Sequence, residues 1–408
     1  MNKFSLKNIA LICGIGTILM MSSCGKETGC TDPDAVNYDP DAEENCCCVF
    51  ETPTGDQNVI VSGSITTDTE WTSDNIYELA NKVVVEDGVT LTIQAGTIIK
   101  GREGTGSLSS ALIVARGGKI MANGTADSPI IFTSILDNIV RGQLTGTNLT
   151  EVDNAKWGGL IILGYAPISA EEGDNEAQIE GIPADEDFGR YGGGSNPNPA
   201  DNSGVLRYVS IRHGGSLIGE GNEINGLTLG GVGTGTVIEN VEVVANLDDG
   251  IECFGGTVNI TNAIVAFQGD DGIDLDQNYS GTIDNFFVLH GIDTDEAMEI
   301  DGPEGTLNDG LFTLRNGTVQ TTDGAGSAAD LKSKAQGLIE NTTFWGYANA
   351  KWLKLRCSFT DDCATPKTDA YDYFTNGSNN LVLSGCEFGN TAGDEMVSVY
   401  TKSEDESV

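Results

Sequence analysis

Residues 236–277 read TVIENVEVVANLDDGIECFGGTVNITNAIVAFQGDDGIDLDQ, and the second half of this stretch repeats the pattern of the first. In both halves apolar and polar residues alternate in a short run, which begins at Ile251 and again at Ile273. Alternation with a period of two predicts a strand with one buried face. Such a strand, recurring at intervals in the twenties after an Asp-Gly turn, is typical of one rung in a stacked array.

The same pattern continues to Arg356 and aligns into columns. Two apolar columns, two residues apart, contain Leu227, Ile251, Ile273, Met298, Leu331 and Leu353, and then Leu229, Cys253, Leu275, Ile300, Ser333 and Leu355. The polar columns contain Thr228, Glu252, Asp274, Glu299, Lys332 and Lys354, and then Gly230, Phe254, Asp276, Asp301, Lys334 and Arg356. The polar columns therefore change from acidic to basic along the chain.

A second series supports this register. An asparagine follows each of several apolar, strand-like runs, at Asn240, Asn262, Asn285, Asn316 and Asn341. Asparagine tolerates the left-handed backbone of a tight turn. The series resembles the asparagine ladder of right-handed parallel β-helices, the pectin-lyase-like fold, over most of the chain from about residue 80 onward. The resemblance implies an all-β, right-handed parallel β-helix solenoid, with an antiparallel β-sandwich as the rival architecture.

Composition limits the partners. The chain has 408 residues, a formal net charge of −40 and 54 glycines, and this glycine content suits many tight turns. Such a negative charge argues against nucleic acid and against anionic membrane surfaces, and it favours divalent cations. An acidic surface suited to a salty medium is the alternative explanation.

The first residues predict export. Lys3 and Lys7 precede an apolar run, Ile9–Met21, that is too short to span a bilayer, and Ser22-Ser23-Cys24 follows. This arrangement resembles a bacterial lipoprotein signal of the Bacteroidetes type. It implies lipidation of Cys24, contact with the membrane through that lipid anchor alone, and a place on the outer membrane facing the cell surface. An ordinary secretory signal is the alternative.

An acidic, cysteine-rich segment follows the signal. Residues 29–42 carry alternating aspartates and resemble the short calcium modules related to thrombospondin type 3 repeats, although Glu43-Glu44-Asn45-Cys46 replaces the usual ending. A disulfide-closed spacer is the other interpretation. In an exported chain, Cys30 is expected to pair with one of Cys46 to Cys48, and Cys357 with Cys363, whereas Cys253 lies in an inward column.

These features divide the chain into regions. The predicted regions are a signal peptide (1–23), an anchor and linker (24–56), a cap (57–82), a β-helix (83–402) with insertions at 169–202 and 357–380, and an acidic tail (403–408). A terminal coil needs a cover for its open end. Long insertions in a solenoid commonly project over one face and carry function.

The acidic columns predict a charged outer face. Stacked strands lie about 4.8 Å apart, so Glu252, Asp274 and Glu299 are expected to point outward in one row. Carboxylates so close repel each other unless a cation or a basic residue neutralises them. The residues predicted to hold Ca²⁺ are Asp248, Asp249, Asp270, Asp271 and Asp274, and the Asp-Asp-x-x-Asp pattern is similar to the calcium site of one pectate lyase family.

Several functions are compatible with this face. The favoured one is a surface-anchored binding protein without assigned catalysis, whose partner is a glycan or matrix polymer. The residues predicted to contact that polymer are Glu252, Asp276, Glu299, Asp301, Lys332, Lys334, Lys354 and Arg356. The resemblance also implies a calcium-dependent polysaccharide lyase, in which Lys332 is the candidate base. A polygalacturonase-like hydrolase is a further alternative, since Arg212-His213-Gly214-Gly215 faintly matches that family's Gly-His-Gly element.

Overall fold

The computed structural model describes residues 28–31, 37–42, 44–45, 58–171, 175–218, 223–321, 326–347, 352–357, 368–389 and 400–404. The chain divides into two compact units, Met1–Gly55 and Asp56–Val408. In the first unit, β1 (Thr28–Gly29) pairs in parallel with β2 (Glu44–Asn45), and Cys30 is buried. The predicted lipidation residue Cys24 and the cysteines Cys46 to Cys48 and Cys363 lie outside the described residues.

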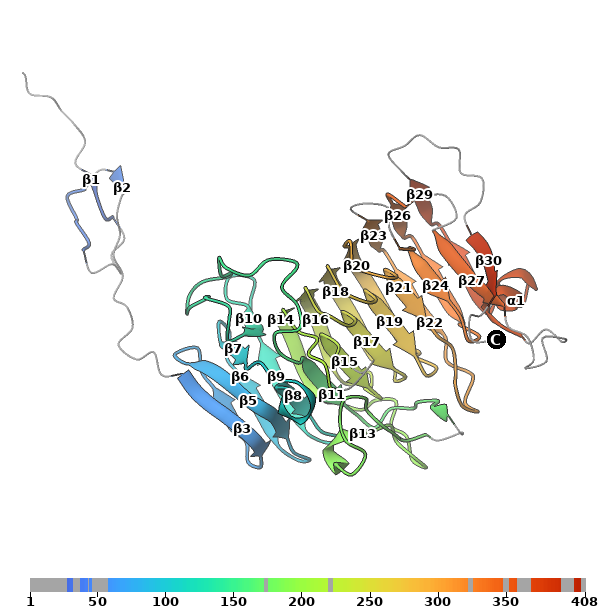
Figure 1. Ribbon diagram of the computed structural model, residues 1–408, viewed down its shortest axis with the longest axis horizontal. Helices are drawn as coiled ribbons and strands as arrows, with labels where there is room; N and C mark the ends of the chain where they lie inside the picture. The colour runs from blue at the N-terminus through green and yellow to red at the C-terminus, as the bar shows by residue number, and fades with distance from the viewer. Residues whose placement is uncertain are drawn as a thin grey trace, which may run out of the picture. The chain divides into compact units, whose positions relative to one another are not determined.

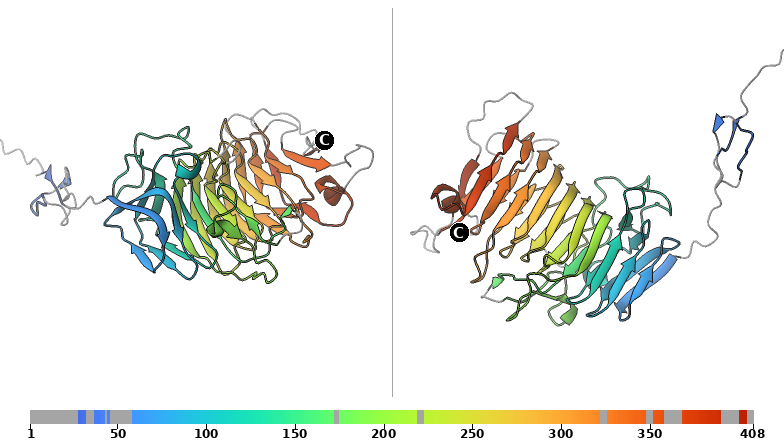
Figure 2. Two further views of the ribbon diagram at one scale, coloured as in Figure 1. Left: turned by 60° about the horizontal axis from the view of Figure 1, so that its bottom comes forward. Right: turned by 180° about the vertical axis from the view of Figure 1, so that it is seen from behind.

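The second unit is a stack of coils, and each coil passes in turn through three faces, here called A, B and C (Figures 1 and 2). Face A contains β4 (Thr69–Trp71), β6 (Thr90–Ile93), β9 (Lys119–Asn123), the first halves of β14 (Gly204–Arg212), β16 (Val237–Val244), β18 (Asn259–Ala266) and β20 (Thr282–His290), then β22 (Phe312–Arg315), β25 (Gly337–Glu340) and β28 (Leu381–Ser384). Face B contains the first halves of β3 (Asn58–Ile65) and β5 (Ile76–Val85), β7 (Ile98–Gly101), β10 (Ile130–Ser134), the second halves of β14, β16, β18 and β20, then β23 (Thr318–Thr321), β26 (Thr343–Trp345) and β29 (Glu387–Gly389).

Face C is the face that the sequence pattern describes. It contains the second halves of β3 and β5, then β8 (Ala111–Val114), β11 (Leu160–Leu163), β15 (Leu227–Gly230), β17 (Ile251–Phe254), β19 (Ile273–Asp276), β21 (Met298–Ile300), β24 (Ala329–Leu331), β27 (Leu353–Cys357) and β30 (Tyr400–Glu404). Every pairing among these 26 strands is parallel, so the predicted parallel β-helix is confirmed and the sandwich is excluded. Within the described residues, no helix is long and apolar enough to cross a membrane.

The core lies inside the coils. The inward columns of face C are fully buried along with their neighbours from the other faces, and Cys253 is a buried free thiol, as predicted. Burial of such side chains contributes about 25 cal/mol per Å² of apolar surface. Residues 57–82, predicted as a cap, contribute β3, β4 and the first half of β5, so the first coil itself forms that end of the stack.

One corner of the helix carries the asparagine ladder. All five predicted asparagines have positive φ, between 48° and 60°. Asn262 donates to Asn240 (2.9 Å), Asn285 donates to Asn262 (2.6 Å), and Asn341 donates to Asn316 (3.5 Å). The ladder is interrupted once, because Asn316 donates to Asp284 instead of Asn285 (2.7 Å).

The predicted columns slip by two residues at one coil. Glu299 pairs with Asp330, and Asp330 pairs with Lys354, so Asp330 occupies the position predicted for Lys332. Correspondingly, Ala329 and Leu331 replace Leu331 and Ser333 in the apolar columns. A slip of two keeps the inward and outward sides unchanged, which is why alternation alone did not detect it.

The predicted insertion at 169–202 packs against the helix. It contains β12 (Ala177–Gln178), η3 (Asp187–Gly189) and β13 (Arg190–Tyr191), and β12 pairs antiparallel with β13 (Figure 1). Its buried residues Ile179, Ile182 and Tyr191 join a second apolar cluster on the outside of face C. A further loop, residues 135–156, connects β10 to β11, and the sequence did not predict it.

Two other connections contain short helices. The 3-10 helix η1 (Gly106–Leu108) lies between β7 and β8. Helix α1 (Ala370–Thr375) lies within the second predicted insertion, and Asp369 forms a capping box with Asp372 at its N-terminus. Strand β30 reaches Glu404, so the parallel β-helix extends beyond its predicted boundary at residue 402.

Candidate metal centre on face C

The outward positions of face C bring acidic side chains into one row. Glu252 pairs in register with Asp274, and Asp274 with Glu299. The prediction that these residues stack in one column is therefore confirmed. The predicted exposure is wrong, since Glu252 and Asp274 are only 5% and 7% exposed.

A second row of acids lies in the turn that precedes each face C strand. The backbone N–H of Asp271 donates to Asp249 Oδ1 (2.9 Å), and that of Glu296 donates to Asp271 Oδ1 (2.7 Å). At the start of this row, the Asp249 N–H donates to Asn225 Oδ1 (3.1 Å). Asn225, Asp249 and Asp271 thus each accept a hydrogen bond from the backbone of the next coil, and Asp249 and Asp271 also lie close to acids of the first row.

The two rows, together with the neighbouring Asp248 and Asp270, form three overlapping groups of carboxylates. The groups are Asp248, Asp249 and Asp270; Asp249, Glu252 and Asp274; and Asp271, Asp274 and Glu299. In each group one oxygen of every member lies within 4.8 Å of the others. We call these groups the acid triads. They unite all five residues predicted to bind calcium, and they add Glu252 and Glu299.

The insertion covers part of this region. The Tyr191 ring lies 5.8 Å from the Phe254 ring, and its hydroxyl donates to Gln277 (3.0 Å). Glu180, also in the insertion, accepts from Asn225 Nδ2 (3.0 Å), and the same amide donates to Glu252. The insertion, a segment far away in sequence, therefore covers the triads around Glu252, whereas Asp270 is exposed.

Burial changes the titration of these acids. Burial and the neighbouring carboxylates raise the pKa of Asp248 to about 7, and burial raises that of Glu299 to about 7 despite Lys332 beside it. Burial, reinforced by neighbouring carboxylates, raises the pKa values of Asp249, Glu252, Asp271 and Asp274 well above the usual range. Charged carboxylates in such surroundings need either protons or a cation.

The surroundings of Asp274 favour a cation over protons. This residue belongs to two of the acid triads, and its buried Oδ1 has no hydrogen-bond partner among the residues that the structure describes. A buried, unpaired carboxylate oxygen is costly unless something positive faces it. The triads supply carboxylate oxygens and neither imidazole nor thiolate, which is the donor set of Ca²⁺ and Mg²⁺ rather than of zinc.

The predicted basic residues are engaged in ion pairs. Lys332 contacts Glu299 (2.8 Å) and Asp301 (3.3 Å), and Arg356 contacts Asp330 (2.5 Å). Lys354 contacts Glu296 and Asp330. The column predicted for Lys334 is wrong, because this exposed residue lies in a turn with φ of 65° and its N–H donates to Asp369.

These ion pairs bear on the catalytic hypotheses. Burial lowers the pKa of Lys332, but Asp301 and Glu299 outweigh this effect and raise it above the usual value, which disfavours proton abstraction by this lysine. His213 is also engaged, since its Nδ1 donates to the Asp153 carbonyl (2.7 Å) in the loop at 135–156. Neither residue is presented as a free catalytic group.

Sequence reasoning missed several residues of this region. Asn225 and Glu296 lie in the turn row, and Asp330 lies in the strand row. The spacing of Asn225, Asp249, Asp271 and Glu296 repeats that of the strand column, so the turn row was detectable. The contribution of Glu180 was not detectable, because only the packing of the insertion brings it to the triads.

The fold and this region define a class: a parallel β-helix with a carboxylate-rich, partly covered outer face. The sequence matches the pectate-lyase-like β-helix domain family over residues 63–358, and the chain belongs to that family. No curated protein matches the sequence.

Solved structures show distant similarity. The pectin methylesterase from Aspergillus niger shares 10% identity over 86% of this chain and 91% of its own, with a TM-score of 0.35. Tailspike protein 2 from the Escherichia coli O157:H7 bacteriophage CAB120 shares 11% identity over 81% of this chain and 38% of its own, with a TM-score of 0.23.

Proposed function

We propose that this protein is a calcium-binding β-helix that is displayed on the cell surface through a lipid on Cys24. The observation that carries the calcium proposal concerns Asp274. This residue is shared by two acid triads, and its buried Oδ1 accepts no hydrogen bond from the described part of the chain. A cation between the triads neutralises carboxylates that otherwise repel each other at a few ångströms. Calcium is favoured over magnesium because it accepts irregular sets of six to eight oxygens.

In this proposal the protein binds its partner and does not cleave it. A lyase reaction needs a base, and the lysine considered for that role is held by Glu299 and Asp301. The corresponding assay is direct: the protein is incubated with polygalacturonate or alginate, and the absorbance of an unsaturated product is followed. We expect no product, and its formation would replace binding by lyase activity as the function.

The calcium proposal is tested by thermal unfolding of chelator-treated protein. We expect calcium to raise the melting temperature, by the equivalent of about 2.7 kcal/mol at a hundredfold excess over Kd. Asp274→Asn removes a charge shared by two triads and is expected to reduce the increase strongly. Asp127→Asn, which changes an exposed acid outside the triads, is the matched control and is expected to retain it. An unchanged melting temperature in the original protein rejects the metal site.

A further inference from the structure

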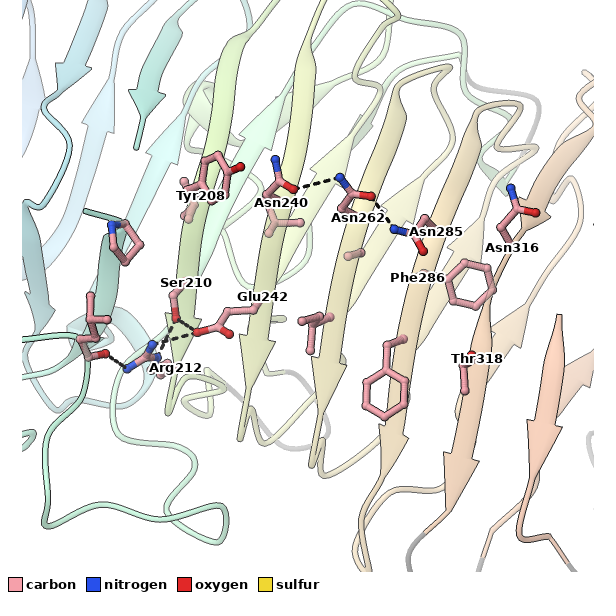
Figure 3. Close-up of a pocket in the computed structure, with 17 residues that line it drawn as sticks. Tyr208, Ser210, Arg212, Asn240, Glu242, Asn262, Asn285, Phe286, Asn316 and Thr318 are labelled. Carbon is pink, nitrogen blue, oxygen red and sulfur yellow. Dashed lines mark hydrogen bonds and ion pairs between the residues drawn. The ribbon is translucent and has the colours of Figure 1, made fainter. Parts of the chain in front are cut away.

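Face B carries a groove that shares no residue with the acid triads. Its volume is about 580 Å³, and Figure 3 shows its lining side chains on successive strands of the helix. These residues come from β14, β16, β18, β20, the start of β23 and the corner before it, with Pro129 and Leu144 at one end. With about 4.8 Å between strands, the groove extends for about 19 Å along the helix axis. That length suits an extended chain molecule.

One rim of the groove is made of neutral amides. Asn240, Asn262 and Asn285 lie side by side and are joined by two hydrogen bonds (Figure 3). Because Asn316 donates to Asp284, Asn285 Oδ1 receives no hydrogen bond from the described residues. Likewise Asn240 Nδ2 donates to no described residue. The rim thus offers an acceptor and a donor about 10 Å apart, two strands from each other.

The floor is apolar where it meets these amides. The outward column of face B runs through Glu242, Ile264, Phe287 and Thr318, paired in register. Ile264 is 45% exposed, and Phe287 beside it is partly exposed. Exposed apolar side chains gathered in a hollow, with a few polar groups beside them, are the usual composition of a ligand site.

The charges in the groove cancel. Arg212 contacts Glu242 at 2.8 Å, and Arg212 also donates to Ser210 and to the Leu144 carbonyl. The Ser210 hydroxyl donates to the same carboxylate (2.5 Å), so the pair is internally satisfied (Figure 3). An anionic ligand meets no free positive charge here, and the chain's net charge of −40 repels it.

We infer that this groove binds a neutral, linear polysaccharide. Such a chain presents C–H faces for the Ile264 and Phe287 floor, and hydroxyl groups that both donate and accept for the amide rim. An extended peptide is less suitable, because it gains affinity by pairing its backbone with a free sheet edge. Here the strands under the groove are already paired on both sides. This inference does not depend on the calcium proposal.

Affinity electrophoresis of the full chain tests the inference. The native gels contain hydroxyethylcellulose, galactomannan or arabinoxylan as neutral polymers, or polygalacturonate as the anionic one, and all runs include a chelator. We expect retardation by at least one neutral polymer and none by polygalacturonate. Retardation by polygalacturonate instead, or by none of the neutral polymers, overturns the inference. Because calcium is absent throughout, failure of the metal site does not affect this result.

Variants connect binding to the groove. Phe287→Ala and Ile264→Asp are each expected to weaken retention about tenfold, the usual effect of truncating an anchor residue. Trp345→Ala is the matched control: this aromatic is 40% exposed on the same face but does not line the groove. Ile264→Asp alters an exposed position, so it remains informative if Phe287→Ala lowers stability. Unchanged retention in Ile264→Asp overturns the assignment to this groove.

Discussion

The five asparagines at the corner between faces A and B, Asn240, Asn262, Asn285, Asn316 and Asn341, have a conformational reason to be asparagine. Their φ angles of 48° to 60° place them in the left-handed region, which costs other L-residues about 1 kcal/mol or more. Asparagine reaches this region easily, and its amide also binds the next coil. One side chain therefore satisfies both the turn and the stacking.

Substitution of Asn262 separates these two contributions. Asn262→Gly keeps the backbone conformation and loses two ladder hydrogen bonds, each of which contributes about 1 kcal/mol. Asn262→Ala loses the same bonds and adds the strain of a positive φ, so we expect it to be less stable than the glycine variant by about 1 kcal/mol. Urea unfolding of the three proteins measures the difference. Equal stability of the two variants would show that the turn carries no strain.

Among the secondary-structure elements, acids from two places lie close together on face C. One set comes from the turns before β17, β19 and β21, and the other comes from the strands themselves. The turn acids bind the backbone of the next coil, and the strand acids face the same space. A stack of parallel strands repeats each outward side chain at the strand spacing. The same repetition that builds a continuous core therefore also concentrates charge on the outside.

This concentration predicts a pH dependence of stability. Burial raises the pKa values of Asp248 and Glu299 to about 7, whereas the carboxyls of an unfolded chain titrate near 4. Between these values the folded protein binds more protons than the unfolded one, so stability falls as pH rises. The contribution of these two carboxyls to the free energy of unfolding is complete below about pH 4 and is lost as pH rises through about 7.

We therefore expect the melting temperature of the metal-free protein to be higher at pH 5.5 than at pH 8. Saturating calcium should raise it more at pH 8, because protons no longer compete for the carboxylates. The same comparison in 0.5 M NaCl distinguishes local burial from general repulsion, which salt screens. A metal-free protein that is more stable at pH 8 would contradict the raised pKa values.

At the scale of the whole molecule, an insertion between β11 and β14 decides which part of face C reaches solvent. Ile179, Ile182 and Tyr191 cover the early coils, where Ile113 and Ile161 point outward. Toward the later coils the outward residues become the acid triads and then the ion pairs of Lys354 and Arg356 with Asp330. Face C is thus apolar and covered at one end and paired in charge at the other.

The anchoring proposal belongs to this scale as well. In a bacterial host, we expect radiolabelled palmitate to be incorporated into the full-length protein and the protein to sediment with membranes. Cys24→Ala is expected to abolish labelling, since the lipid is attached to the thiol of this residue. Cys13→Ala, within the predicted signal, is the matched control and is expected to retain both properties. Labelling that survives the loss of Cys24 would rule out this anchor.

The sequence was sufficient to predict the architecture, the asparagine ladder and the column of Glu252, Asp274 and Glu299, because each depends on a repeat that survives as a periodic pattern. The sequence pattern placed Lys332 and Lys334 in the wrong columns, because the interval from β21 to β24 is longer than the other intervals from β15 to β27. A slip of two residues leaves the inward and outward sides unchanged, so the alternation did not reveal the error.

The folded structure was needed to show that Glu252 and Asp274 are buried, that Glu180 lies beside them and that Lys332 is held in ion pairs. It also revealed the groove on face B, whose lining depends on the loop at 135–156 and on side chains from five coils. The physical reason is that local periodicity sets the direction of a side chain, whereas its exposure and partners depend on segments that pack over it from elsewhere in the chain.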